Sequence, residues 1–495
     1  MNHATKTTAL PSLIGDVLTD PARCIDNLFA DTWKALKFNG LLKATGFTKR
    51  SGISIAEATF LLLLWKWLNV SSIAMFSRKA LETFSNATRD VMYDLLKRED
   101  ISWRALNRKV ARTVHRHHGL ATSPLKVFVL DDSIKARRGK KMEGVSSHFD
   151  HTTHRHVMGQ QVLTLGLATD EAFLPLDSQI FVSNARATPL IRPHKDGRSV
   201  AARRYEEAIT QTKPRMAAGM MKRALRSGLD AEYLVADAWF GTKPMIRTAL
   251  EIGVCPVLRM KKGNMKYRLM TEEGESVLLD AKALHAQVVR KQWRKVSGLP
   301  WKAVSLEVEL NLSEDSQKPD WQPVKLLFVR GLKAPEETDA GKKDWALFLT
   351  TDTRLSMLKM LEVYALRWGI EVYFKEAKQH LGFLAEQTTR FASHTASIHL
   401  CAIRYLMLVH AKLEGMAARI GEARSSIQDS LNAMSLAGNL WQLFRSVISG
   451  SLHELQDRLG CSVETVMQVI DERIHAFLAR SLQLDVFTLR SEHEQ

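Results

Sequence analysis

Lys126-Val-Phe-Val-Leu130-Asp131-Asp132 is the stretch of this 495-residue sequence that decides the fold, because a helical pattern gives way here to an extended one. The β-branched and apolar residues over 126–130 predict a short strand that is followed directly by two carboxylates. Two further strands are predicted over 157–168 and 172–182. The stretch therefore opens a three-stranded meander and puts acidic side chains where its first strand ends.

The chain beyond the meander alternates between helices and strands. A charged helical stretch over 201–226 precedes an apolar strand over 233–236, which ends at Asp237. A helix over 243–250 and a strand over 255–258 follow. This order predicts an α/β class, and it resembles the ribonuclease-H-like core, in which an antiparallel hairpin region is continued by parallel strands.

The composition favours a polyanionic partner. Seventy lysines and arginines against 53 acidic residues give a formal net charge of +17, spread along the whole chain. Such a balance is typical of proteins that bind nucleic acid, although it also occurs in basic proteins whose charge serves only solubility. We therefore take DNA as the favoured partner and look for motifs that support it.

The cysteines and the apolar runs argue against several other classes of protein. The cysteines have no paired short spacing, which argues against a disulfide framework or a zinc ribbon and fits a reducing cytoplasm; they are Cys24, Cys255, Cys401 and Cys461. The strongest apolar run, over 60–65, is interrupted by Lys66 and is far too short to span a membrane. We expect no membrane partner and, without a glycine-rich phosphate loop, no nucleotide cofactor.

The sequence outside the α/β pattern divides into helical and β-rich segments. Residues 1–120 have apolar residues at helical spacing and predict a DNA-binding region, in which a polar turn near Ser71 would permit a helix-turn-helix or simply join two helices of a bundle. The core is expected to occupy 121–260, to be interrupted by a β-rich insertion over 261–354 and to resume with a long helix within 355–392. Residues 393–495 are helical again and could serve dimerisation.

A regular stripe of arginines precedes the core. Basic residues repeat every four positions, with an apolar stripe on the opposite side of the same predicted helix; the basic residues are Arg104, Arg108, Arg112 and Arg116, and the apolar ones are Leu106, Val110 and Val114. The arginines would form either a solvated face or a surface that contacts DNA phosphates. Both interpretations stay open at this point.

The stretch Tyr364-Ala-Leu-Arg367-Trp-Gly-Ile-Glu371-Val-Tyr-Phe-Lys-Glu-Ala-Lys378 predicts a functional helix. At 100° per residue, the four numbered side chains lie within about 60° of one another on one face. A carboxylate would be flanked there by two cations and a phenol. The alternative is an ordinary solvated ion-pair network.

Two acids that follow apolar strands, Asp132 and Asp237, would complete a three-carboxylate site with Glu371. Mg²⁺ prefers hard oxygen ligands and takes only one or two carboxylates per ion, so three acids suffice for two ions bridged by a scissile phosphate, and Mn²⁺ could substitute. Arg367, Lys378 and Tyr364 would then hold DNA phosphates beside the ions. The residues themselves leave Asp131 open as an alternative first ligand.

At this point a specific resemblance appears. The spacing Tyr364, two residues, Arg367, three residues, Glu371, six residues, Lys378 is similar to the tyrosine-arginine-glutamate-lysine signature of bacterial insertion-sequence DDE transposases that carry a β-rich insertion before the catalytic glutamate. The resemblance covers about residues 125–385. In that family the first acid precedes serine or threonine, which selects Asp132, before Ser133, and the second acid corresponds to Asp237.

The resemblance implies an activity and a set of partners. Such an enzyme binds the terminal inverted repeats of its element, cleaves by two-metal phosphoryl transfer through a DNA hairpin, and joins the ends to target DNA as a homodimer in the bacterial cytoplasm, associated with the nucleoid. It also implies that Trp345 stacks on a flipped base, although a strand tryptophan is more often core. The rival hypotheses are a two-metal nuclease or resolvase on the same fold and a non-catalytic DNA-binding regulator.

A group of histidines after the basic loop 135–141 invites a zinc interpretation, which we consider weaker than that of a solvated or phosphate-near loop because no cysteine accompanies it. The histidines are His148, His151, His154 and His156.

Overall fold

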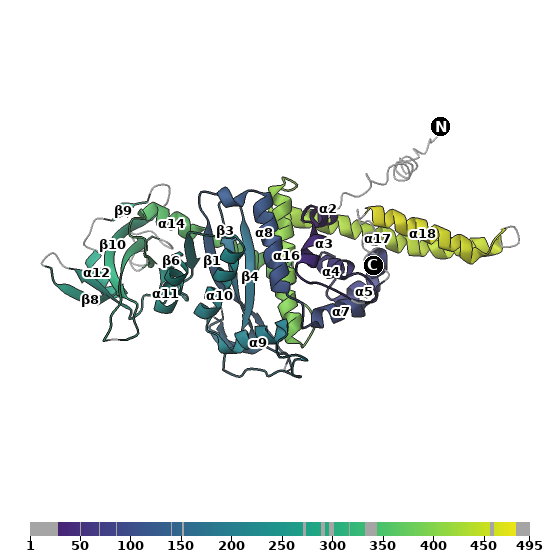
Figure 1. Ribbon diagram of the computed structural model, residues 1–495. Coiled ribbons are helices and arrows are strands. Elements are labelled where there is room, and N and C mark those ends of the chain that lie inside the picture. Colours follow the sequence, from purple (N-terminus) through teal and green to yellow (C-terminus); the bar gives the residue numbers. More distant parts are fainter. Residues whose placement is uncertain are drawn as a thin grey trace, which may run out of the picture. The chain divides into compact units, whose positions relative to one another are not determined.

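The computed structural model describes residues 28–49, 51–68, 70–85, 87–139, 141–150, 153–270, 274–288, 293–296, 301–315, 317–331, 344–455 and 460–481. They fall into two compact units (Figure 1). Unit 1 comprises Met1–Leu106, Ser199–Ala201 and Ala377–Gln495, and unit 2 comprises Asn107–Arg198 and Ala202–Glu376. Helices α8 (Trp103–His117), α9 (Val200–Thr210) and α15 (Trp368–Gln379) contain residues of both units.

Unit 2 is built on a mixed sheet. Its first strands are β1 (Val127–Ala136), β2 (Ser146–Asp150), β3 (Arg155–Ala168), β4 (Phe173–Phe181), β5 (Tyr233–Ala236) and β6 (Cys255–Met260). β1 pairs antiparallel with β3, and β3 antiparallel with β4, whereas β1, β5 and β6 are parallel to one another. The α/β class is confirmed, and the order β4-β3-β1-β5-β6 is consistent with a ribonuclease-H-like fold.

Strand β1 is longer than the sequence predicts. Its parallel pairing with β5 ends at Leu130, but its antiparallel pairing with β3 continues until Ala136 lies opposite Gly159. The prediction that Asp131 and Asp132 follow the strand is therefore wrong, because both lie inside it. Acidic and basic residues are poor strand formers on their own, and it is the partner strand β3 that keeps this segment extended.

The described residues after β6 add six more strands to the same sheet. They are β7 (Lys266–Met270), β8 (Ser276–Asp280), β9 (Arg294–Lys295), β10 (Lys302–Asn311), β11 (Trp321–Arg330) and β12 (Trp345–Thr350), with helix α12 (Ala281–Val288) between β8 and β9. The last of them, β12, pairs antiparallel with β6, with Leu347 opposite Met260. The β-rich segment therefore joins the edge of the core sheet through main-chain hydrogen bonds.

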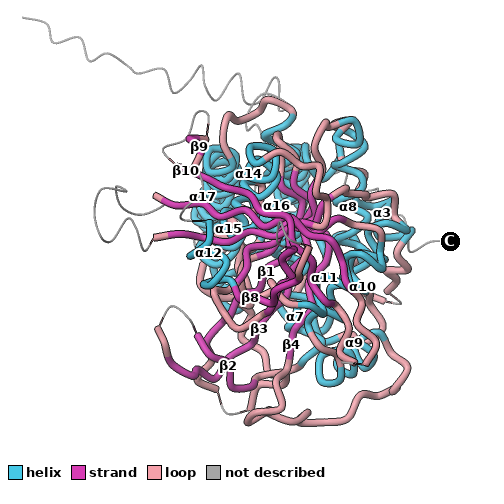
Figure 2. Tube along the Cα trace, turned by 90° about the vertical axis from the view of Figure 1, so that its left-hand side faces the viewer, coloured by secondary structure: helices cyan, strands magenta, loops and turns pink. Residues whose placement is uncertain are grey.

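Helices cover both faces of the core sheet. Helices α10 (Lys213–Arg226) and α11 (Lys243–Ile252) pack against each other (Figure 2), and α10 also packs against β3 and β4 whereas α11 packs against β6. Side chains alternate along a strand, and Asp132 contacts α10 whereas its neighbour Asp131 contacts Arg367, between α14 (Met357–Ala365) and α15. The α14–α15 region and α10 therefore lie on opposite faces of β1.

The long helix expected through Glu371 is broken in two. Between α14 and α15 the amides of Arg367 and Gly369 donate to the carbonyls of Tyr364 and Leu366, at 3.0 and 3.1 Å, which is the three-residue spacing of a tighter turn. A Cβ on Gly369 would lie 3.0 Å from Phe173 of β4, so this turn approaches the sheet closely. Tyr364 thus stands on a different helix from Glu371, which corrects the expectation of one shared face.

Unit 1 is helical. Its helices, besides those shared with unit 2, are α2 (Leu28–Ala35), α3 (Phe38–Ala44), α4 (Ile55–Leu64), α5 (Ile73–Lys79), α6 (Leu81–Phe84), α7 (Arg89–Lys97), α16 (Phe391–Leu413), α17 (Ile420–Glu454) and α18 (Val463–Ser481). Helix α16 is buried over 391–411 and contacts α2, α4, α7 and α17, so it is the centre of this unit. No helix in the described part of the chain has the length and apolarity that crossing a membrane requires.

A fully buried arginine on α16 fastens three segments of unit 1. The guanidinium of Arg404 donates to the carbonyls of Leu62 and Leu63 near the end of α4, and to the carbonyl of Leu381 at 2.8 Å. Helix C-termini leave carbonyls without helical partners, and here a cation meets them. Burial lowers the pKa of Arg404 from its usual value.

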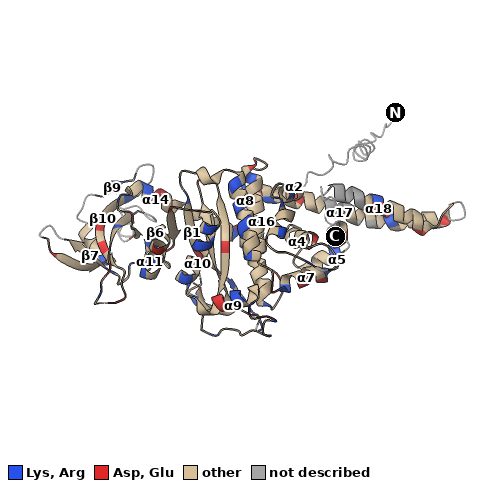
Figure 3. Ribbon diagram, viewed as in Figure 1, with Lys and Arg blue, Asp and Glu red and all other residues tan. Residues whose placement is uncertain are grey.

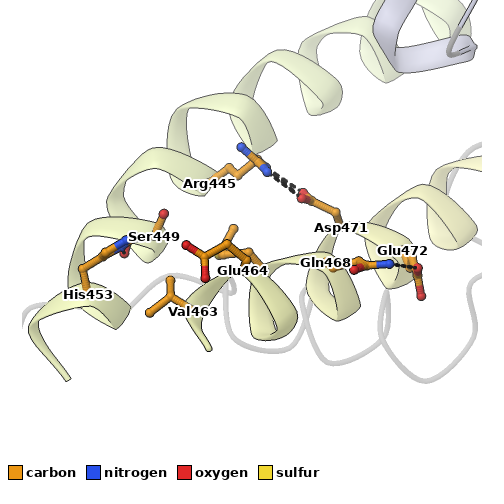
Figure 4. Close-up of a pocket in the computed structure, with 9 residues that line it drawn as sticks. Arg445, Ser449, His453, Val463, Glu464, Gln468, Asp471 and Glu472 are labelled. Carbon is orange, nitrogen blue, oxygen red and sulfur yellow. Dashed lines mark hydrogen bonds and ion pairs between the residues drawn. The ribbon is translucent and has the colours of Figure 1, made fainter. Parts of the chain in front are cut away.

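Helices α17 and α18 lie against each other, with an ion pair between them. Arg445 of α17 forms an ion pair of 2.8 Å with Asp471 of α18 (Figure 4). The pocket between the two helices is lined by Arg445, Ser449, His453, Val463, Glu464, Met467, Gln468, Asp471 and Glu472. α17 also exposes a set of large apolar side chains, namely Leu436, Leu440, Leu443 and Val447, each at least 45% exposed.

Candidate active site

Neighbouring parallel strands bring two acids together. Leu130 of β1 lies opposite Ala236 of β5, and the next residue on each chain is an aspartate, Asp131 and Asp237. Glu371 lies in the first turn of α15, which reaches the same face of the sheet through the α14–α15 turn. The fold therefore gathers carboxylates from β1, from the end of β5 and from α15.

Arg367 joins two of these acids. Its guanidinium lies 3.6 Å from the Asp131 carboxylate and donates to the Glu371 carboxylate four residues along the chain. The same group stands 5.7 Å from the ring of Tyr364, whose other neighbour is Phe348 of β12 in an edge-to-face contact. Arg367 thus contacts Tyr364, Asp131 and Glu371 at once.

The electrostatics of the site show how closely the acids are crowded. Burial, and then the negative charges of Asp237 and Asp132, raise the pKa of Asp131 to about 7, against a lowering by Arg367. Burial also raises the pKa of Tyr364. A donor set of hard oxygens with surplus negative charge suits a divalent cation such as Mg²⁺, which would relieve the repulsion between the acids.

Asp237 fixes the turn that follows β5. Its carboxylate accepts a hydrogen bond of 2.9 Å from the amide of Trp239, and its carbonyl accepts one of 3.1 Å from the amide of Phe240. A Cβ on Gly241 would come within 2.4 Å of the Arg259 carbonyl, so only glycine lets this turn lie against β6. Trp239 is 45% exposed beside the acid.

The structure does not bring Asp132 to this cluster, contrary to the expectation for the first metal ligand. Because successive side chains of a strand point to opposite faces, Asp132 lies on the other side of β1 from Asp131. Its carboxylate accepts from the Gln161 amide at 2.7 Å and pairs with the Lys213 ammonium at 2.6 Å. The three acids that converge are therefore Asp131, Asp237 and Glu371.

The residues that hold Asp132 could not be predicted from the sequence. Lys213 belongs to a charged helix, α10, and Gln161 to an apolar strand, β3, and neither position carries a signal that links it to β1. Their proximity results from pairing between distant segments. For Trp239 the sequence does contain a signal, because an aromatic residue only two positions after Asp237 must lie close to that acid.

The predicted DNA contacts have different surroundings. Lys378 is exposed and lies on α15 two turns after Glu371. In the arginine stripe, Leu106, Val110 and Val114 are fully buried as expected. The arginines do not share one exposed face.

Burial separates the members of the stripe. Arg104 is only 8% exposed, Arg108 donates to the Ser227 hydroxyl at 2.9 Å, Arg112 is half-buried and Arg116 is exposed. Figure 3 shows the basic residues on α8 and α10. The structure thus gives Arg104 and Arg108 protein surroundings, and Arg116 is the member best placed to meet phosphate.

Trp345 is packed in protein. It is 9% exposed, stacks on His285 with ring centres 4.2 Å apart and planes 5° apart, and has the Lys262 ammonium 4.2 Å from its ring centre. Burial, followed by Lys262 and Arg330, lowers the pKa of His285 to about 4, so its ring is neutral at pH 7. A base could stack on Trp345 only after one of these groups moved, and the core interpretation fits the structure better.

The histidines do not gather around a common centre among the described residues. His148 is buried in β2 and its Nε2 lies 2.9 Å from the Ser146 hydroxyl, whereas His154 and His156 are exposed. Burial, followed by the Lys213 charge, lowers the pKa of His148 to about 4. His151 lies outside the described residues.

Two family models match overlapping parts of the chain. The model of the family described as DDE superfamily endonuclease matches residues 70–274, which contain Asp131 and Asp237. The model described as Transposase DDE domain matches residues 204–407, which contain Asp237 and Glu371. Enzymes with such domains typically use divalent metal ions.

Other comparisons add no argument about function. The chain of the structure titled "Crystal structure of the NurA nuclease from Sulfolobus solfataricus" is 10% identical, with 49% of this chain and 73% of that chain covered, and its TM-score of 0.23 is too low to establish a common fold. No curated protein matches the sequence. The two overlapping family matches, together with the convergent acids, indicate that this chain is a DDE transposase enzyme.

Proposed function

We propose that the protein is the transposase of a bacterial insertion sequence, of the group with the tyrosine-arginine-glutamate-lysine signature. It would bind the terminal inverted repeats, cleave at the ends and join the freed 3′ hydroxyls to target DNA. The observation that carries this proposal is that Asp131 lies beside Asp237 and shares Arg367 with Glu371, on a sheet with ribonuclease-H-like strand order. The net charge of +17 suits a DNA partner.

The three acids would hold two Mg²⁺ ions, or Mn²⁺ in their place. When bound, such ions stabilise the attacking and leaving oxygens of an in-line phosphoryl transfer. Asp131 and Asp237 are fixed by adjacent parallel strands, and Glu371 reaches them from α15. Arg367 pairs with Asp131 and Glu371. When these carboxylates hold metal ions, its guanidinium would be available to bind DNA phosphates.

The salt dependence of DNA binding tests Arg367, before α15, and Lys378, on α15. Arg367→Ala and Lys378→Ala should each lower the slope of log affinity against log salt by about one unit, because each loses one phosphate contact. Fluorescence anisotropy with an element-end duplex over a salt series measures this. Lys359→Ala, which removes a surface lysine paired with Glu362 on α14, should leave the slope unchanged. Unchanged slopes for both variants would show that they serve only as ion-pair partners.

The pH dependence of metal binding tests Asp131. A carboxyl whose pKa is raised to about 7 in the folded protein must lose its proton before it binds a cation, so divalent-ion affinity should fall about tenfold per pH unit below 7. Since the folded state binds this proton more tightly than the unfolded state, the metal-free protein should lose stability as pH rises from about 4 to 7. Calorimetric Mn²⁺ titrations from pH 5.5 to 8 measure the first effect. Asp131→Asn should lack the pH dependence, and a flat profile for the unaltered protein would refute the role.

Reaction products separate the proposal from its nearest rival. Labelled element-end duplex, incubated with the protein and Mg²⁺, should give nicks, hairpins and joined products on denaturing gels. Cleavage without joining would favour a nuclease or resolvase on the same fold.

Because Trp345 is packed against His285, hairpin formation aided by a base on Trp345 would require that stack to open. Equal slowing of nick and hairpin in Trp345→Ala would show that the residue acts only in packing.

We also propose that two copies pair in the DNA complex through α17. Leu436, Leu440, Leu443 and Val447 lie within about 60° of one another on a helical wheel and are exposed, on the side opposite to Arg445, which contacts α18. Light scattering of the complex with end duplex should give two protomers, and Leu440→Asp with Leu443→Asp should reduce this to one. Ser426→Asp, on α17 outside this set, is the matched control. A complex that stays dimeric in the double variant would place the interface elsewhere.

A further inference from the structure

The second acid of the doublet is engaged on the opposite face from the proposed metal site. One oxygen of Asp132 accepts from Gln161 and the other lies 2.6 Å from the ammonium of Lys213. The side chains of Asp132 and Lys213 are only 15% and 10% exposed. Both carboxylate oxygens therefore serve protein donors in a nearly closed ion pair.

Lys213 links this pair to the turn that carries Asp237. Its ammonium lies 5.2 Å from the ring centre of Phe181, 5.3 Å from that of Trp239 and 6.0 Å from that of Phe240. The last two rings belong to the turn that Asp237 itself closes through its hydrogen bond to the Trp239 amide. A second ammonium, from Lys261, lies 4.2 Å from the Trp239 ring centre.

We infer that Asp132 is a positioning residue, which holds Lys213 against the aromatic turn and thereby fixes the orientation of the Asp237 carboxylate. The inference rests on the proposed function in so far as Asp237 is a metal ligand. A buried ammonium that loses its carboxylate partner moves toward water, because an unpaired charge is costly in a low-dielectric site. Phe240 then loses the cation near its ring, Trp239 keeps only the Lys261 ammonium, and the turn is held less firmly.

The doublet thus divides two tasks between adjacent residues. Asp131 faces the proposed metal site, and Asp132 acts from the other side of the strand through Lys213 and the turn. Neither residue can take over the task of the other, because the alternation of the strand keeps their side chains on opposite faces.

A fluorine signal from Trp239 reports on the turn without DNA or metal. The full chain is labelled with 5-fluorotryptophan, and Trp239→Phe identifies the signal among the 11 tryptophans. Asp132→Asn and Lys213→Met should each shift this signal in the same direction, and the double variant should shift it no further than Lys213→Met alone. Asp230→Asn, which breaks the Asp230–Lys126 pair of 2.6 Å beside the start of β1, is the matched control and should leave it unchanged. An unmoved Trp239 signal in Asp132→Asn overturns the inference.

Cleavage kinetics provide the second readout. Asp132→Asn should slow cleavage about ten- to a hundredfold, as expected for a displaced ligand, and Asp132→Glu should recover part of the loss. Adding Lys213→Met to Asp132→Asn should cost no more than about threefold further, because the two residues act as one unit. A fully additive double variant overturns the inference. If Asp131→Asn leaves cleavage intact while Asp132→Asn still shifts the Trp239 fluorine signal, the proposed metal site is wrong but the positioning role of Asp132 stands.

Discussion

Asp131→Asn should reduce cleavage of an element-end duplex at least about a thousandfold, whereas Asp132→Asn should retain a measurable rate. The first substitution removes a charged oxygen donor from the site shared with Asp237 and Glu371. The second removes a carboxylate that contacts Lys213 and Gln161. At about 1.4 kcal/mol per factor of ten, the loss of several kcal/mol of metal stabilisation accounts for the difference.

Single-turnover cleavage with Mg²⁺ measures the effect, and Asp237→Asn and Glu371→Gln should match Asp131→Asn. End binding in Ca²⁺, whose looser coordination supports binding better than chemistry, checks that each variant still recognises DNA. The opposite ranking, with Asp132→Asn inactive and Asp131→Asn active, would show that Asp132 is the first metal ligand, as the family pattern suggests, and that Asp131 is not.

Arg404→Met should destabilise unit 1 more than any surface substitution. It leaves the carbonyls of Leu62, Leu63 and Leu381 without their buried donor. Removal of one side of a buried charged network costs about 3–5 kcal/mol, because the remaining polar groups stay buried and unsatisfied. Urea unfolding followed by circular dichroism should show an earlier transition for the helical unit.

Arg445→Met is the matched control for Arg404→Met. The arginine is also ion-paired, with Asp471, but its side chain is 45% exposed, and exposed pairs contribute only about 0–1 kcal/mol. The control should therefore leave the transition nearly unchanged. Similar shifts for both variants would mean that the contacts of Arg404 contribute little and that α16 is held by its apolar neighbours alone.

Local patterns predicted the strands that fix the candidate site. Each of the core strands except β2 has an apolar run that alternates or ends at a turn signal, so their order along the chain could be derived before any pairing was known. The polar segment of β2, Ser146–Asp150, carries no such run and is not predicted as a strand. The position of Asp237 directly after β5 followed from the same pattern. The helical spacing of Glu371 and Lys378 was also readable, because both stand on one uninterrupted helix, α15.

Features that depend on distant partners were not predictable in this way. The extension of β1 to Ala136 is imposed by β3, and the choice between Asp131 and Asp132 depends on which face of β1 meets α15. A one-residue difference in a strand reverses the face, and no local pattern in the doublet reveals it. The arginine stripe illustrates the same limit, since its regular spacing does not reveal that Arg104 is only 8% exposed.

The order in which the sheet is assembled also has a temporal consequence during synthesis on the ribosome. β12 is the last strand of the β-rich segment to be made, yet it is the one that docks on β6, and Glu371 emerges only after it. Such long-range pairing is slow, because a long loop must close before its contacts form. A nascent chain therefore lacks Glu371 until the whole β-rich segment has been translated, and the proposed site cannot form before then.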